Sequence, residues 1–159
     1  MNEAELYKKR LDMWGGNIDA VGMYYMFIEM SHTWDDLVDK DREVTEEQIN
    51  KAFLIAMVYL PANSFYLSIQ REVLPMWVSV VSAYEVANTF ERNKDEHGLE
   101  IAHGLRYAAG HILSYALHVC VGRNKAQEIL PELWKDIFFE RFDDYKKGHL
   151  DANEHIQTI

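Results

Sequence analysis

Acidic side chains gather at the end of one amphipathic helix that the apolar spacing predicts over residues 18–39. At 100° per residue, five side chains fall within a sector of roughly 120°: Glu29, His32, Asp35, Asp36 and Asp39. Negative charge near a helix C-terminus costs about 0.3–1 kcal/mol per residue, and like charges four residues apart repel further. A divalent cation would remove both penalties, and Mg²⁺ is typically held by one or two carboxylates plus substrate phosphates. The sequence therefore predicts a Mg²⁺ site at Asp35, Asp36 and Asp39.

The same helix face is apolar before it becomes acidic. Upstream, the sector carries Ile18, Val21, Gly22, Tyr25 and Ile28. A solvated face has no reason to change in this way, whereas the wall of an apolar pocket with an anionic mouth does. We expect this pocket to be lined by Val21, Tyr25, Trp77, Val81 and Tyr84.

Helix direction predicts which polar groups meet at the mouth of this pocket. Short connections favour antiparallel neighbours, so alternate helices of a bundle point the same way. Several helix ends would then form one rim containing Asp35, Asp36, Asp39, Asn88, Glu91, Asp95, Glu100, His103, Glu140, Asp143 and Asp144.

The run Asp35-Asp36-Leu37-Val38-Asp39 resembles the DDxxD motif of class I isoprenoid synthases. That all-helical family holds Mg²⁺ and a substrate diphosphate with DDxxD at the rim of an apolar cavity. Its second metal motif has Asn, Ser/Thr and Glu at four-residue steps, and the matching positions are Asn88, Arg92 and Glu96. Arg92 departs from the family pattern, and an arginine there would contact phosphate directly. The resemblance implies a minimal Mg²⁺-dependent protein that handles a diphosphate small molecule.

Two Glu-x-x-His motifs support an alternative. Ferritin-like bundles build a di-iron site from two such motifs and glutamates of two other helices. The predicted ligand set is Glu29, His32, Glu91, Glu100, His103 and Glu140.

A third hypothesis is a non-catalytic helical interaction or assembly protein. Four tryptophans and nine tyrosines supply residue types that dominate protein interfaces, and an acidic rim would attract a basic protein partner. An exposed apolar patch would favour this hypothesis. The runs WDDLVDKD, INKAF, LPANSFY and VANTFER also resemble an uncharacterised family of small tailed-phage proteins, which implies no known activity.

The elements that must position these residues are all helical. Apolar residues recur at helical spacing, few prolines and glycines interrupt them, and no hairpin signal occurs. We expect a single all-α domain over residues 1–148, an antiparallel bundle of about six helices, followed by a polar, frayed tail over 149–159. The expected helices are 3–14, 18–39, 46–73, 76–94, 97–121 and 125–147.

Local signals set the expected helix boundaries and the state of other reactive groups. Thr45 and Gln48 resemble a capping box, and Pro75 suits the first turn of the fourth helix. The fourth and fifth helices carry few charges and are expected to be central and buried. His111 and His118 are expected to be neutral core residues, and Cys120 a buried, inert thiol.

Composition excludes several functions. A formal net charge of −10 disfavours sequence-independent nucleic-acid binding. The apolar run Tyr107–Val121 is shorter than the roughly 20 residues that span a bilayer, so no membrane span is expected. The charged N-terminal residues lack the apolar core of a signal peptide. A single cysteine suits a reducing compartment, which predicts a cytoplasmic protein.

Overall fold

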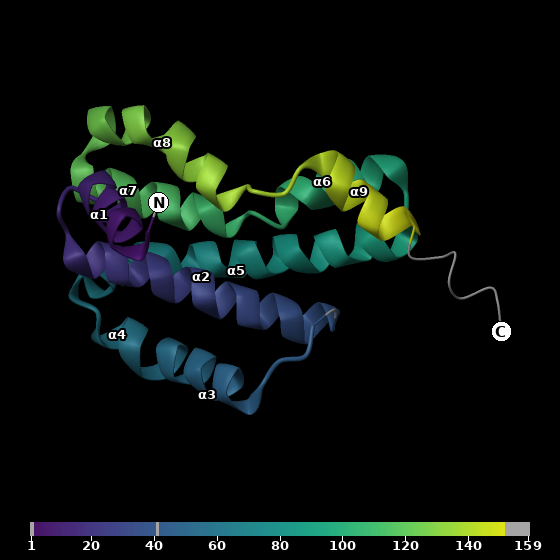
Figure 1. Cartoon of the computed structure of the whole chain (residues 1–159), viewed down its shortest axis with the longest axis horizontal. Coiled ribbons are helices and arrows are strands. Elements are labelled where there is room, and N and C mark those ends of the chain that lie inside the picture. Colours follow the sequence, from purple (N-terminus) through teal and green to yellow (C-terminus); the bar gives the residue numbers. More distant parts are fainter. Residues whose placement is uncertain (1, 41, 152–159) are drawn as a thin grey trace. The chain divides into compact units, whose positions relative to one another are not determined.

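The protein is an all-α helical bundle, as the sequence predicts. The computed structural model describes residues 2–40 and 42–151, and no strand occurs among them (Figure 1). The helices are α1 (Glu3–Met13), α2 (Ile18–Asp39), α3 (Glu46–Leu54), the π-helical segment η1 (Ile55–Tyr59), α4 (Leu60–Ala62), α5 (Ser64–Asn93), α6 (Glu96–Leu105), α7 (Ala109–Val121), α8 (Arg123–Ile137) and α9 (Phe142–Asp151).

The chain divides into two compact units. The first unit contains the residues up to Arg71 together with Ala116–Gly122, and the second contains Glu72–Tyr115 together with the residues from Arg123 onward. Each has its own buried apolar side chains: Trp14, Met23, Phe27, Ile69 and Leu117 in the first, and Val80, Leu99, Ile112, Leu113 and Leu133 in the second. The expectation of a single domain over 1–148 stays a prediction.

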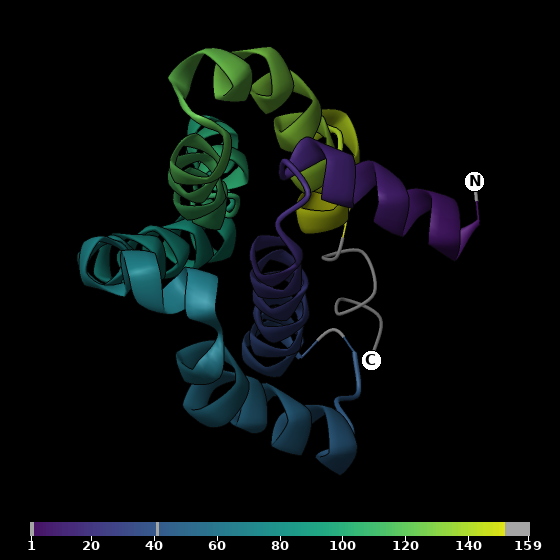
Figure 2. The ribbon, with the colours of Figure 1, turned by 90° about the vertical axis from the view of Figure 1, so that its left-hand side faces the viewer.

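In the first unit, α2 lies beside α3 and η1, and α2 and α3 run in opposite directions (Figures 1 and 2). The side chain of Asn17 caps the start of α2 by accepting a hydrogen bond from the Ala20 amide. The predicted capping box is confirmed: Thr45 and Gln48 satisfy each other's backbone amides at the start of α3. The predicted bounds of α2 agree with the structure, and the start of the helix carries the local signal of Asn17.

The helix boundary predicted at Pro75 is wrong. Pro75 lies inside α5, and the chain instead breaks at Asn63, where the axes of Glu46–Ala62 and Ser64–Asn93 differ by 103°. Asn63 fixes this bend because its Oδ1 accepts from the Tyr66 amide at 2.8 Å and its Nδ2 donates to the Asp19 carbonyl at 2.9 Å. Pro75 removes the hydrogen bond to the Arg71 carbonyl, but both residues are exposed, so water can satisfy that oxygen.

Two further predicted helices are broken in the second unit. The predicted helix 97–121 becomes α6 and α7, separated by Arg106–Ala108, and the predicted helix 125–147 becomes α8 and α9. The first break turns Arg106 toward the buried carboxylate of Glu91. Helix α9 continues to Asp151, beyond the expected start of the tail at 149, and residues 152–159 lie outside the described part of the chain.

Close packing in the second unit depends on one glycine and a small apolar cluster. Helix α6 packs on α9, and Ala87, Leu99, Ala102 and Tyr145 form a buried cluster between α5, α6 and α9. Gly110 lets α7 approach α8 closely, since a Cβ atom there would lie 2.7 Å from the Trp134 ring.

We therefore expect Gly110→Ala to lower the free energy of unfolding by about 1–3 kcal/mol, the usual cost of overpacking. Gly104→Ala is the matched control, because a Cβ atom at this exposed position of α6 would have no neighbour within 4 Å. It should raise stability by about 0.5–1 kcal/mol through helix propensity. Urea unfolding of both variants measures the difference, and equal stabilities would contradict the close packing of α7 on Trp134.

Candidate functional site

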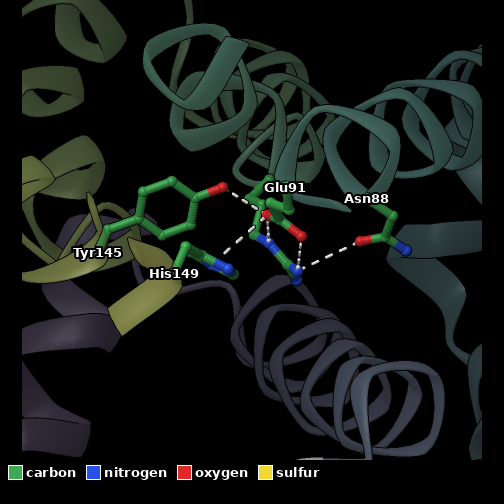
Figure 3. Close-up of polar contacts among 5 residues, drawn as sticks. Asn88, Glu91, Tyr145 and His149 are labelled. Carbon is green, nitrogen blue, oxygen red and sulfur yellow. Dashed lines mark hydrogen bonds and ion pairs between the residues drawn. The ribbon is translucent and has the colours of Figure 1, made fainter. Parts of the chain in front are cut away.

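The densest polar cluster of the second unit surrounds the carboxylate of Glu91 on α5, which is 7% exposed (Figure 3). Arg106 binds both of its oxygens, through Nε to Oε1 at 2.5 Å and through Nη2 to Oε2 at 2.6 Å. The Tyr145 hydroxyl of α9 donates to Oε1 as well, and His149 Nε2 lies 3.9 Å from the same oxygen. Glu91 thereby connects α5 with the end of α6 and with α9.

Arg106 has two more neighbours on α5. Its Nη2 donates to Asn88 Oδ1 at 3.2 Å, and its guanidinium carbon lies 5.0 Å from the centre of the Tyr84 ring. A cation over an aromatic face is stabilised by the ring quadrupole. The guanidinium is therefore held on several sides at once, as a buried charge requires.

The cluster shifts two pKa values in opposite directions. Burial alone would raise the pKa of Glu91, but the hydrogen bonds from Arg106 and Tyr145 and the charge of Arg106 outweigh it and hold that pKa below its usual 4.5. Burial raises the pKa of Tyr145 far above its usual range, and its hydrogen bond to the Glu91 carboxylate raises it further. Glu91 is ionised and Tyr145 is neutral at physiological pH.

His103 occupies an aromatic environment next to this cluster. Its ring centre lies 4.7 Å from that of Phe138 and 4.8 Å from that of Tyr145, and Nε2 lies 3.1 Å from the Glu140 carbonyl oxygen. Of the predicted rim residues, His103 contacts the Glu140 backbone and the Tyr145 ring, and Tyr145 in turn binds Glu91. Because Glu91, Arg106 and Tyr145 already bind one another, we call this cluster a structural clasp.

The predicted Mg²⁺ ligands lie on the last turns of α2, in the first unit. Asp35 and Asp36 are half-buried and Asp39 is exposed. Across the described residues, no three His, Cys, Asp or Glu side chains gather as a potential metal site. The Mg²⁺ site stays a prediction.

The predicted diphosphate residues belong to the second unit and have other contacts. Asn88 accepts from Arg106, Arg92 donates to Thr89 Oγ1 at 3.3 Å, and exposed Glu96 pairs with Lys146. Their participation in one site with the aspartates of α2 stays a prediction.

The predicted pocket residues differ in burial. Val21 and Tyr84 are buried and Trp77 is half-buried, whereas Tyr25 and Val81 are exposed. Tyr84 lies against Arg106, so part of its environment is charged.

The alternative di-iron residues are engaged separately. Glu29 pairs with Lys51, and Glu100 contacts His97 at 3.3 Å. Both carboxylate oxygens of Glu91 accept hydrogen bonds from Arg106. His32 is exposed, and His103 contacts the backbone at Glu140. This ligand set stays a prediction, with no group of three assembled in the described chain.

The expected state of the other reactive residues needs correction. His111 is exposed and rests against the Trp134 ring at 5.2 Å, so its assignment to the core is wrong, while His118 is half-buried. Cys120 is half-buried rather than buried, and its Sγ lies 3.1 Å from the Trp14 carbonyl oxygen. Burial raises the pKa of the Cys120 thiol, which agrees with the expected lack of reactivity.

Sequence analysis missed the main surface feature, an apolar face on α3 and η1. Helix α3 has no buried residue, and five large apolar side chains are 42–66% exposed: Ile49, Phe53, Leu54, Met57 and Val58. We call these five residues the α3 face. The signal was present in residues 52–70, which carry no charge, but such a run also suits a buried helix.

The same region bears on membrane association. No single helix in the described ranges is long and apolar enough to cross a membrane. The bent pair Glu46–Ala62 and Ser64–Asn93 meets the requirement of length and composition only when taken together.

The buried ion pair gives a direct test of the clasp. Glu91→Gln leaves the half-buried guanidinium of Arg106 without its carboxylate, and we expect the free energy of unfolding at pH 7 to fall by about 3 kcal/mol. Glu100→Gln is the control, since it removes an exposed carboxylate and should change stability by less than about 0.5 kcal/mol. Similar small effects in both variants would contradict a structural role for the pair.

The lowered pKa of Glu91 also predicts how the stability of Glu91→Gln relative to the wild type changes with pH. The folded pKa of Glu91 lies below its usual 4.5, so its contribution is complete above that value and is lost as the pH falls through the folded pKa. The stability difference between the wild type and Glu91→Gln should be constant above about pH 5.5 and narrow in acid. Chemical unfolding over a pH series measures it, and a difference that grows in acid would contradict the lowered pKa.

Comparisons with known proteins identify no relative from which a function could be inferred. A scan against protein-family models, a search of curated proteins and a search of solved structures gave no match. The resemblances to class I isoprenoid synthases and to small tailed-phage proteins therefore stay predictions. What the protein does must follow from its residues and their contacts.

Proposed function

We propose that this chain is a non-catalytic helical interaction or assembly protein, and that its partner docks on the α3 face. The observation that carries the proposal is the exposure of five large apolar side chains on α3 and η1, of which α3 buries no residue and η1 buries only Ile55. Exposed apolar patches of this kind mark protein interaction sites. The single cysteine of the chain fits an interaction that takes place in the cytoplasm.

The size of the face suits a modest interface. At roughly 200 Å² for a large side chain, the exposed fractions amount to roughly 500 Å², near the upper end of the patches found on single proteins. A partner burying a similar area would give about 1,000 Å² in total, the lower limit for a specific interface. Burying the α3 face at about 25 cal/mol per Å² yields roughly 12 kcal/mol, and the costs of association are of the same order. We therefore expect micromolar rather than nanomolar affinity.

The local structure also fits a binding element. Isolated helices shorter than about 12–15 residues are marginal in water, so even the span Glu46–Ala62 is only just above this limit, and its first part, α3, buries no residue. Helix α3 continues into the π-helical segment Ile55–Tyr59, where only Ile55 is buried. Segments of π-helix occur frequently at functional sites. A partner covering the α3 face would supply the packing that this helix lacks.

A photoreactive residue at position 57 tests the proposal in cells that naturally make the protein. The same residue at position 78 is the control, because Val78 is equally exposed but lies on α5. We expect one protein to cross-link from position 57 and not from position 78. Titration of that purified protein should then show binding weakened roughly 30-fold by Met57→Asp, the effect of an interface hot spot, and unchanged by Val78→Asp.

Two outcomes would contradict the proposed surface. One is equal cross-linking from both positions, and the other is a dissociation constant that Met57→Asp leaves unchanged. Because Met57 is exposed, the variant should keep the thermal midpoint of the wild type, which separates lost binding from lost folding.

A second candidate is a Mg²⁺-dependent protein that handles a diphosphate. The observation that favours it is the position of Asp35, Asp36 and Asp39 on the last turns of α2, where the helix dipole disfavours three carboxylates. Bound Mg²⁺ would neutralise them and would act as a Lewis acid and template for a diphosphate.

Thermal unfolding with Mg²⁺ and inorganic pyrophosphate, separately and together, tests this candidate. A ligand at about 100 times its dissociation constant adds roughly 2.7 kcal/mol, which raises the midpoint by a few degrees. The rise should need both ligands and disappear in Asp36→Asn but not in Glu72→Gln, which removes an exposed carboxylate from α5 outside the predicted rim. No rise in any combination would exclude a diphosphate site.

A further inference from the structure

The α3 face begins where the most acidic segment of the chain ends. Residues 29–47 contain eight acidic and two basic residues, a formal charge of −6 out of −10 for the whole chain. This segment covers the end of α2 and the first turn of α3, where Glu43, Glu46 and Glu47 are exposed. Ile49, the first residue of the α3 face, follows within one turn.

The sequence that carries the α3 face, residues 49–58, contributes one positive charge. Lys51 is the basic residue nearest the α3 face in sequence, and it pairs with Glu29 of α2. The hydrogen bond and charge of Glu29 raise the pKa of Lys51, so this lysine is committed to its neighbour. Residues 52–70 are uncharged. The α3 face is therefore acidic at its start and neutral along the remainder.

We propose that the occupant of the α3 face is an amphipathic helix with a basic polar side. This inference rests on the proposed function and names the chemistry of the partner. Ile49, Phe53 and Met57 are spaced by four residues, which on a helix gives a ridge that packs into the groove of a second helix. Lysine and arginine beside the apolar stripe of the partner would lie next to the acidic segment. This charge complementarity would favour basic over acidic partners and raise the association rate.

Charge argues against two other occupants. A second copy of the chain would bring another segment of charge −6 and a total charge of −10 against the first. An anionic lipid surface would be repelled by the same acidic segment. A second copy would give concentration-dependent dimers, and a lipid surface would give sedimentation with vesicles, so both differ from binding of a basic helix.

Three synthetic peptides of about 17 residues, the length of Glu46–Ala62, test the inference by fluorescence anisotropy with the full chain. The first has leucines at helical spacing and Lys/Arg elsewhere, the second has the same leucines with Glu elsewhere, and the third has the first composition in scrambled order. We expect the first to bind at least about tenfold more tightly than the other two, and to weaken as salt rises.

Two variant pairs separate the apolar and the electrostatic contributions. Met57→Asp should abolish binding of the first peptide although it adds a negative charge, whereas Val78→Asp should leave it unchanged. Glu43→Gln with Glu47→Gln should weaken binding and reduce its salt dependence. The control, Glu72→Gln with Glu85→Gln, removes two exposed carboxylates from α5 and should leave both unchanged.

Several results would overturn the inference. These are equal binding of the acidic or scrambled peptide, unchanged binding in Met57→Asp, concentration-dependent dimers lost in Met57→Asp, and sedimentation with phosphatidylserine-containing vesicles lost in the same variant. If position 57 cross-links one protein but the basic peptide is not preferred, the proposed function stands and only the partner chemistry fails. If both experiments are negative, both proposals fail.

Discussion

The second unit depends on the burial of one negative charge. A carboxylate as enclosed as that of Glu91 would be costly without a partner, so Arg106 has to reach it. Arg106 lies at the end of α6, fifteen residues away, and the chain leaves the helix there before α7 begins. The Tyr145 hydroxyl of α9 donates a further hydrogen bond to this carboxylate. The path of the chain from α5 to α6 and the position of α9 are thus consequences of this one ion pair.

The first unit is stabilised by apolar burial and by one side chain at its bend. Trp14, Phe27 and Ile69 are fully buried, and Asn63 joins the start of α5 to α2. Helix α3 contributes no buried residue to this core. Its large apolar side chains are therefore not explained by the stability of the unit. The proposed function assigns them a use outside the unit, which is why it rests on the α3 face rather than on the buried clasp.

The sequence predicted those elements whose ends carry local signals. Helix α2 begins after the capping residue Asn17, and α3 begins with the capping box of Thr45 and Gln48. The bend at Asn63 could not be predicted in this way, because half of its hydrogen bonding goes to Asp19, forty-four residues away. Proline was a weaker signal than expected, since Pro75 sits where water replaces the lost hydrogen bond. Local chemistry fixes helix starts, and tertiary contacts decide the breaks.

The same distinction applies to the candidate sites. Residue spacing singled out Asp35, Asp36 and Asp39, but spacing alone does not tell which carboxylate is buried. The ion pair of Glu91 and Arg106 is evident only from the fold. The uncharged run 52–70 is visible in the sequence. An uncharged helix is compatible with burial in its own fold or with burial against a partner. For α3, none of whose residues is buried, the proposed function takes up the second of these possibilities.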